Sequence, residues 1–133
     1  MTDPGGSVEG LFTRDHYAAL LGMRLVSSQP VTVELAVEER HHNFHGMTHG
    51  AAVFSVADCA FALASNAAGD RAVGIDTHLA LTAATAAGDL LTAVAEEATR
   101  GHTLATYRVT VTRGDGRVCG VFTGTVHITP APP

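Results

Sequence analysis

The sequence predicts an α+β protein in which one long central helix is wrapped by a curved, mostly antiparallel sheet. The stretch from residue 51 to 66 reads as a helix that is apolar on every face, and such a helix is normally buried on all sides. Six other segments have the composition or the alternation of β-strands. Because one curved sheet cannot cover every face of the helix, we expect a second copy of the chain to complete its burial.

Local signals mark the elements on either side of this helix. Thr13 is expected to cap a short helix. One face of this helix carries Tyr17, Leu20 and Leu21, and Gly22 ends it. Two strands precede the central helix and four follow it. The predicted strands are residues 23–28, 31–37, 72–81, 89–99, 103–113 and 118–129.

Tight connections predict that the last three strands form an antiparallel meander. Gly101 lies in the first connection, and Gly114-Asp115-Gly116 is a strong hairpin turn.

The chain of 133 residues suits a single domain, which we place at residues 13–129. Residues 1–12 are expected to form a disordered N-terminal tail, and residues 130–133 a short C-terminal tail.

Composition and charge exclude several classes of protein. The hydrophobic fraction of 46% is enough for a core, while the formal charge of −5 and the absence of Lys argue against a nucleic-acid partner. No apolar run is long enough to span a membrane, and no signal peptide is visible. Cys59 and Cys119 lie in apolar runs, as reduced core thiols do, so we expect a cytoplasmic protein.

Asp58 is the candidate functional residue of the central helix. It is the one carboxylate in that apolar run, and no Lys or Arg lies within seven positions on either side. Asp is rarely fully buried without a partner. One explanation is a helix edge that reaches solvent. The explanation we favour is a functional acid in an apolar groove, with a pKa tuned by desolvation.

The histidines before the helix raise the alternative of a metal site. Four of them lie between positions 41 and 49, and Asp58 follows. However, Gly46 separates His45 from His49, and no cysteine pair or second ligand cluster is present. The chain also has no Gly-x-Ser-x-Gly hydrolase motif and no glycine motif for a nucleotide. We therefore expect no metal and no cofactor.

The central stretch also carries a family pattern. Its positions are Asn43, Gly46, His49, Gly50, Ala57, Asp58 and Asn66. This pattern resembles that of the PaaI-type hotdog thioesterases, and a weaker likeness continues at Gly88-Asp89 and Asp115-Gly116. The resemblance covers roughly residues 13–129. It implies the hotdog fold and the hydrolysis of acyl-CoA, with aryl-acetyl esters such as phenylacetyl-CoA as candidate substrates.

Four residues are the candidate catalytic groups under this resemblance. Asp58 attacks the thioester to give a mixed anhydride, or it deprotonates a water. The backbone N–H of Gly50 is the candidate oxyanion donor, because the first N–H groups of a helix lack partners within it. Asn43 orients the thioester or a water, or it bonds its own loop; His49 bonds substrate, or it caps the helix. Asn66 is expected to be a helix-end residue.

Helix geometry predicts that the site is shared between two chains. Gly50 and Asp58 are eight residues apart, or about 12 Å along one helix. One thioester carbonyl cannot contact both groups of the same helix, whereas antiparallel helices in a two-fold dimer bring them together. We therefore expect a homodimer. As a separate expectation, two such dimers pair into a homotetramer.

Two departures from the family pattern affect substrate binding. Ala51 replaces a second glycine, which is compatible with a helix start. Leu81-Thr82-Ala83-Ala84 stands where many relatives have an aromatic-Leu-Arg-Pro sequence, so an Arg that could contact CoA phosphates is missing near Ala83.

The alternative function is a hotdog module that binds an acyl thioester without turning it over. Asp58 argues against that alternative, because a pure binder gains nothing from a desolvated carboxylate.

Overall fold

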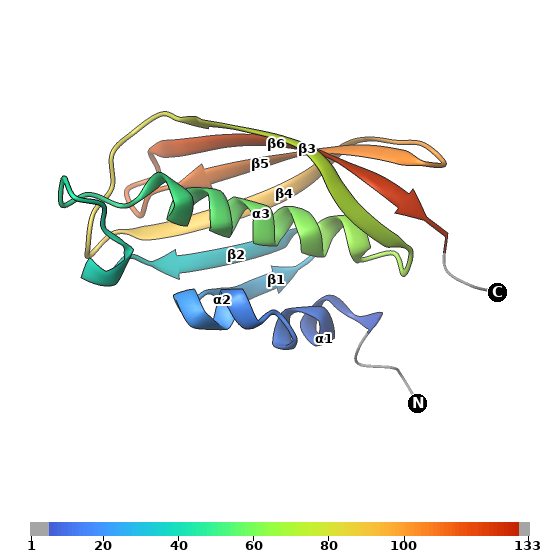
Figure 1. Cartoon of the computed structure of the whole chain (residues 1–133), viewed down its shortest axis with the longest axis horizontal. Helices are drawn as coiled ribbons and strands as arrows, with labels where there is room; N and C mark the ends of the chain where they lie inside the picture. The colour runs from blue at the N-terminus through green and yellow to red at the C-terminus, as the bar shows by residue number, and fades with distance from the viewer. Residues whose placement is uncertain (1–5, 131–133) are drawn as a thin grey trace.

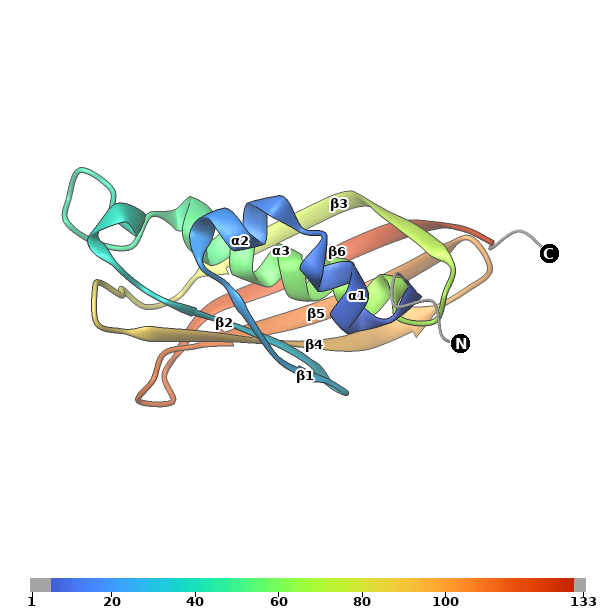
Figure 2. The ribbon, with the colours of Figure 1, turned by 90° about the horizontal axis from the view of Figure 1, so that it is seen from below.

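The computed structural model describes residues 6–130 and shows one long helix lying across a curved, six-stranded antiparallel sheet (Figures 1 and 2). The sheet order is β1-β2-β4-β5-β6-β3. Its strands are β1 (Arg24–Ser28), β2 (Val31–Ala36), β3 (Arg71–Leu81), β4 (Leu90–Arg100), β5 (Leu104–Thr112) and β6 (Val118–Thr129). The helices are α1 (Val8–Thr13), α2 (His16–Leu21), the short 3-10 helix η2 (Glu39–His41) and α3 (Gly50–Asn66).

The predicted α+β hotdog architecture is confirmed. The meander β4-β5-β6 is present, and each predicted strand lies within two residues of its observed bounds. Gly116 has the positive φ of 88° that its turn requires. No helix within residues 6–130 is long and apolar enough to cross a membrane.

The core lies between α3 and the concave face of the sheet. Its largest fully buried side chains are Phe61, Phe122, Leu35, Leu91, Val33, Val56, Val109, Val111 and Val126. One stripe of α3 is left without full cover by the rest of the chain, because α1 and α2 pack beside the helix and the sheet covers its opposite face (Figure 2). This open stripe consists of Ala51, Ser55, Asp58 and Ala62, which are exposed or half-buried.

The N-terminal region differs from the sequence prediction. Residues 1–12 were expected to be disordered, but Val8–Thr13 form α1, which is capped by Ser7 through a bond from the N–H of Gly10. Thr13 was expected to cap the next helix, yet it is the last residue of α1, and Asp15 caps α2 instead. The side-chain carboxylate of Asp15, two residues after Thr13, accepts a hydrogen bond from one of the N–H groups that lack a partner at the start of α2. Residues 1–5 and 131–133 of the expected tails lie outside the described residues.

The buried face of α2 also differs from the prediction. Tyr17 and Leu20 are 57% and 65% exposed, whereas Ala18 is 1% exposed and faces the core. Gly22 ends the helix with a φ of 84°, as predicted. The small side chain of Ala18 allows α2 to lie close to α3, and this places the N-terminus of α2 beside the middle of the central helix.

Strand β3 is an edge of the sheet and, within residues 6–130, pairs only with β6. Val73 and Ile75 on this strand are 52% and 60% exposed. An exposed edge strand with apolar side chains is a surface that proteins normally cover or protect. This edge lies along the same side of the molecule as the second half of α3 (Figure 1).

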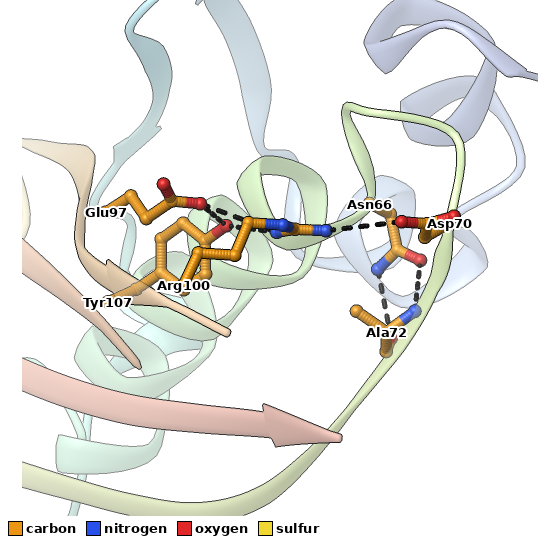
Figure 3. Close-up of polar contacts among 6 residues, drawn as sticks. All are labelled: Asn66, Asp70, Ala72, Glu97, Arg100 and Tyr107. Atoms are coloured by element: carbon orange, nitrogen blue, oxygen red, sulfur yellow. Dashed lines mark hydrogen bonds and ion pairs between the residues drawn. The ribbon is translucent and has the colours of Figure 1, made fainter. Parts of the chain in front are cut away.

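Asn66 ties the C-terminal end of α3 to the start of β3 (Figure 3). Its side-chain oxygen accepts a hydrogen bond from the N–H of Ala72 at 2.9 Å, and its amide nitrogen donates to the carbonyl of Ala72 at 3.0 Å and to that of Ala62 at 2.8 Å. The expectation that Asn66 is a helix-end residue is confirmed. These bonds fix the position of the helix relative to the edge strand.

A second polar cluster lies beyond the same end of α3 (Figure 3). The hydroxyl of Tyr107 donates to Glu97 at 2.7 Å and accepts from Arg100 at 3.0 Å, and Arg100 also lies 3.7 Å from Asp70. Burial, and then the hydrogen bond to Glu97, raise the pKa of Tyr107 to about 12. The phenol therefore stays protonated and links β4 to β5.

We predict that Asn66→Ala lowers the free energy of unfolding by about 1–3 kcal/mol, because it removes three hydrogen bonds and leaves both backbone groups of Ala72 without their partner. Urea denaturation measures the change. Ser65→Ala is the matched control, since the Ser65 hydroxyl donates to no described group other than the Ala62 carbonyl, and we expect it to cost clearly less. Equal losses in the two variants would show that the tie to β3 contributes nothing.

Candidate active site

Asp58 lies half-buried on the open stripe of α3. Burial raises the pKa of its carboxyl, and the negative charge of Asp15 raises it further. Of the two explanations for this carboxylate, the structure therefore combines parts of both: the side chain reaches solvent, but it loses hydration to its apolar neighbours. A carboxylate in this state is more basic than an ordinary surface aspartate.

Asp58 borders a cavity of about 650 Å³ between α3 and β3, which we call the β3 cavity. Phe61 and Ala62 line it from the helix, and Ala72–Thr77 line it from the edge strand. This volume lies within the usual range for small-molecule sites. The cavity therefore offers room for a ligand next to the carboxylate.

The N-terminus of α3 leaves one backbone donor available. His49 is the N-cap, and its Nδ1 accepts the N–H of Ala51 at 3.0 Å. The carbonyl of His49 accepts the N–H of Ala52 at 2.9 Å. The N–H of Gly50 has no hydrogen-bond acceptor within residues 6–130. An unpaired N–H at a helix N-terminus is suited to binding negative charge.

Asn43 shapes the loop before α3. Its Oδ1 accepts the N–H of His45 at 2.9 Å and that of Met47 at 3.3 Å. Within the described chain, Asn43 therefore bonds its own loop, and His49 caps the helix, which were the structural alternatives for these two residues. The amide nitrogen of Asn43 makes no hydrogen bond to any described residue, so it is available to a ligand.

Asn43 and Gly50 line a second cavity of about 380 Å³, which we call the loop cavity. Its other wall is residues 81–85, which comprise the last residue of β3 and the segment that follows it. Asp58 does not line this cavity, and Gly50 does not line the β3 cavity. The structure thus brings Asn43 and Gly50 together but keeps Asp58 apart from both, as expected for two groups about 12 Å apart on one helix.

The two departures from the family pattern lie in this region. Ala51 is exposed on the open stripe, and its N–H is the one that His49 caps. Leu81–Ala84, which lacks the family's Arg, lines the loop cavity. Arg113, the residue directly after β5, donates to the carbonyl of Ala84 in this segment at 3.0 Å, but it is also ion-paired with Asp115 at 2.6 Å.

Three of the four histidines bond separate backbone groups, namely His41, His42 and His49. Nδ1 of His41 accepts the N–H of Glu38 at 2.9 Å, so its Nε2 carries the proton and donates to the carbonyl of Leu21 at 2.8 Å. Nε2 of His42 accepts the N–H of Ala87 at 2.9 Å. Within residues 6–130 no cluster of three or more potential metal ligands is present. These side chains connect η2 and the loop to their neighbours.

Two contacts that support the site are not visible in the sequence. Thr85 is buried, and its hydroxyl donates to that of Thr48 at 2.7 Å, while its carbonyl accepts the N–H of Thr48 at 2.8 Å. This pair fixes the Asn43 loop against residues 81–85. The second is the proximity of Asp15 to Asp58. The role of Asp15 as an N-cap could be recognised from the sequence, but its position beside Asp58 could not.

Comparison with known proteins gives one consistent family. The family described as the Thioesterase superfamily matches residues 45–120. A putative esterase of Deinococcus radiodurans is 44% identical over 113 residues, which cover 83% of this chain and 77% of that protein. The acyl-coenzyme A thioesterase PaaI of Escherichia coli is 28% identical over 123 residues, which cover 91% of this chain and 88% of that protein.

Solved structures agree with the sequence comparisons. The E. coli PaaI protein from the phenylacetic acid degradation operon matches this structure with a TM-score of 0.89 at 26% identity, over 96% of this chain and 94% of that one. The family match spans more than half of the chain, and the fold, the long helix and the strand order agree with it. The chain therefore belongs to the thioesterase superfamily, as a thioester hydrolase of the PaaI-type hotdog group.

Proposed function

We propose that the protein hydrolyses acyl-CoA to a free acid and CoA, with Asp58 as the reacting carboxylate. The observation that carries this proposal is the position of Asp58, half-buried on an open helix stripe and next to a cavity that can hold an acyl group. The raised pKa of its carboxyl makes it a stronger base and a stronger nucleophile than a fully hydrated aspartate.

Two routes are open to Asp58. As a general base it takes a proton from water, and the hydroxide attacks the thioester carbonyl; the C–S bond then breaks, and the thiolate recovers the proton from Asp58. As a nucleophile it attacks the carbonyl itself, expels the thiolate and forms a mixed anhydride, which water cleaves to the acid. Both routes pass through a tetrahedral oxyanion, which the unpaired N–H of Gly50 would stabilise.

We further propose that Gly50 and Asp58 of one site come from different protomers of a two-fold dimer. Three features support this assembly. The two groups line separate cavities in one chain, the stripe that carries Asp58 is uncovered, and the β3 edge exposes Val73 and Ile75 beside it. A partner that packs its α3 antiparallel would cover the stripe and place its Gly50 near Asp58. We also propose that such dimers pair into a tetramer.

For the acyl group we propose aryl-acetyl esters such as phenylacetyl-CoA. The names given to E. coli PaaI and to its structure, which refer to acyl-coenzyme A and to phenylacetic acid degradation, support this choice. The described cysteines, Cys59 and Cys119, are buried and unpaired, which supports our proposal that the protein works in a reducing, cytoplasmic compartment.

We predict that the protein releases free thiol from acyl-CoA, and that phenylacetyl-CoA is cleaved with a higher kcat/KM than short or long straight-chain esters. A thiol-reactive dye measures the rates. Asp58→Asn protein, purified in the same way, controls for contaminating esterases. If no ester of the three types is hydrolysed above background, the acyl-CoA proposal fails and the binding-module alternative replaces it.

We predict that Asp58→Asn lowers kcat/KM by roughly 100-fold or more, because Asn keeps the shape of the side chain but can act neither as base nor as nucleophile. The melting temperature at neutral pH should stay equal or rise. The pKa of Asp58 is raised in the folded state, so its ionised form opposes folding above that pKa, and the substitution removes this cost.

Glu96→Gln is the matched control for this variant. Glu96 is an exposed carboxylate on β4, outside the β3 and loop cavities, and its substitution should leave kcat/KM unchanged. A loss of less than about tenfold in Asp58→Asn, equivalent to ~1.4 kcal/mol of barrier, would exclude Asp58 as the reacting group.

We predict that two inactive variants restore activity when they are co-expressed. Asp58→Asn lacks the reacting carboxylate. Gly50→Pro lacks the N–H, and proline is tolerated at the first helical position; His49 before it already has the extended ψ of 135° that a following proline requires. In a mixed dimer, one site contains both defects and the other contains neither, so each mixed dimer should regain about half of the wild-type activity, because one of its two equivalent sites is intact.

Gly50→Ala separates the loss of the N–H from the added bulk. It keeps the N–H and places a Cβ 3.1 Å from Cδ1 of Leu81, a flexible side-chain end, so it should retain activity that Gly50→Pro loses. Differently tagged chains show whether mixed dimers form. Mixed dimers that form and stay inactive, while both variants are folded, would rule out the shared site.

A further inference from the structure

A second carboxylate shares a cavity with Asp58 on the opposite side from β3. This space of about 260 Å³ lies between α2 and α3, and we call it the α2 cavity. Asp15 and Asp58 are its two acidic residues, and Tyr17, Met23, Phe54 and Cys59 line the rest with small side chains. Asp58 therefore lies between the β3 cavity, where we place the substrate, and the α2 cavity, where Asp15 lies.

Asp15 is held in a fixed orientation. Its Oδ1 accepts the N–H of Ala18 at 2.9 Å, as the N-cap of α2. Its Oδ2 lies 3.8 Å from Sγ of Cys59, which donates to it and which directly follows Asp58 on α3. One oxygen thus anchors the carboxylate to α2 while the other faces the central helix.

The surroundings of Asp58 contain little that could offset a second negative charge. The titratable groups that face it are Asp15 and Tyr17 across the α2 cavity, Cys59 on its own helix and Asp76 across the β3 cavity. No cation lines either cavity within the described part of the chain. Among apolar side chains, the electrostatic interaction between two charges is stronger than it would be in water.

The acid–base properties of Asp58 and its neighbour agree with this geometry. Desolvation and then the charge of Asp15 raise the pKa of Asp58. Desolvation, then the charge of Asp15 and the hydrogen bond to it, raise the pKa of Cys59 to about 12, which keeps this thiol protonated as a donor. Arg14 precedes Asp15 in the chain but lines neither cavity.

We propose that Asp15 is a positioning residue of the active site, which acts on Asp58 across the α2 cavity and sets the pH range in which Asp58 works. The proposal rests on the proposed role of Asp58 in thioester hydrolysis. Like charges close together make the loss of a proton less favourable, so Asp15 keeps Asp58 more basic. A more basic Asp58 takes the proton of the attacking water more readily, or attacks the thioester more readily as a nucleophile.

The test separates the charge of Asp15 from its capping role. Asp15→Asn removes the charge but retains a good N-cap, whereas Asp15→Ala removes both. We expect the acidic limb of the kcat/KM profile to move to lower pH in both variants and by the same amount, because the pKa of Asp58 falls toward its usual range. The plateau value of kcat/KM, above the acidic limb, should fall by about tenfold or less, since Asp58 itself remains. Only Asp15→Ala should lower the melting temperature appreciably.

A purely structural role for Asp15 predicts a different pattern, in which activity follows the melting temperature and the acidic limb does not move. That pattern would overturn the proposal. Ser7→Ala is the matched control, because it removes the N-cap of the neighbouring helix α1 without touching the α2 cavity, and it should leave the limb in place.

A direct titration distinguishes failure of this proposal from failure of the proposed function. The side-chain carboxyl carbon of Asp58, followed by NMR in the full-length protein, should titrate at lower pH in Asp15→Asn than in the wild type. This readout needs no substrate, so it holds even if the wild type hydrolyses no acyl-CoA. An Asp58 titration that is the same in both proteins would contradict the proposal.

Discussion

The partial desolvation of one carboxylate is the constraint on which the other features of this structure depend. Asp58 lies in a helix whose neighbouring turns are apolar, and the sheet covers the opposite face of that helix. The chain leaves the stripe around Asp58 open, so the side chain keeps some contact with solvent. Full burial without a partner would strongly oppose folding, whereas full exposure would give an ordinary, weakly basic carboxylate.

The two ends of α3 are fixed by different interactions, and these set where the groups of the site lie. At the C-terminal end, Asn66 bonds Ala72 and holds the helix to the edge strand. At the N-terminal end, His49 caps the helix and the Thr48–Thr85 pair holds the preceding loop. The helix therefore acts as a rigid spacer between Gly50 and Asp58, and this spacing is what makes a second protomer necessary for the proposed mechanism.

The sequence predicted those features that depend on local signals. The strand pattern, the turn at Gly116 and the apolar helix with its single Asp58 are periodic or short-range, so they were found with bounds close to those observed. Helix α1 was missed because it has only six residues and directly follows a stretch that contains Pro4, Gly5 and Gly6. Asp15 and Cys59 are 44 residues apart, and Thr48 and Thr85 are 37 apart; contacts at such separations depend on packing and leave no local signal.

A crystal structure of the Asp58→Asn variant with bound phenylacetyl-CoA tests the central claim most directly. The account predicts that the thioester carbonyl oxygen lies roughly 3 Å from the backbone nitrogen of Gly50 in one protomer, within hydrogen-bond reach. The carbonyl carbon should lie next to residue 58 of the other protomer, with the acyl group in the β3 cavity. A thioester bound by Gly50 and residue 58 of the same chain, or one that contacts neither group, would contradict the account.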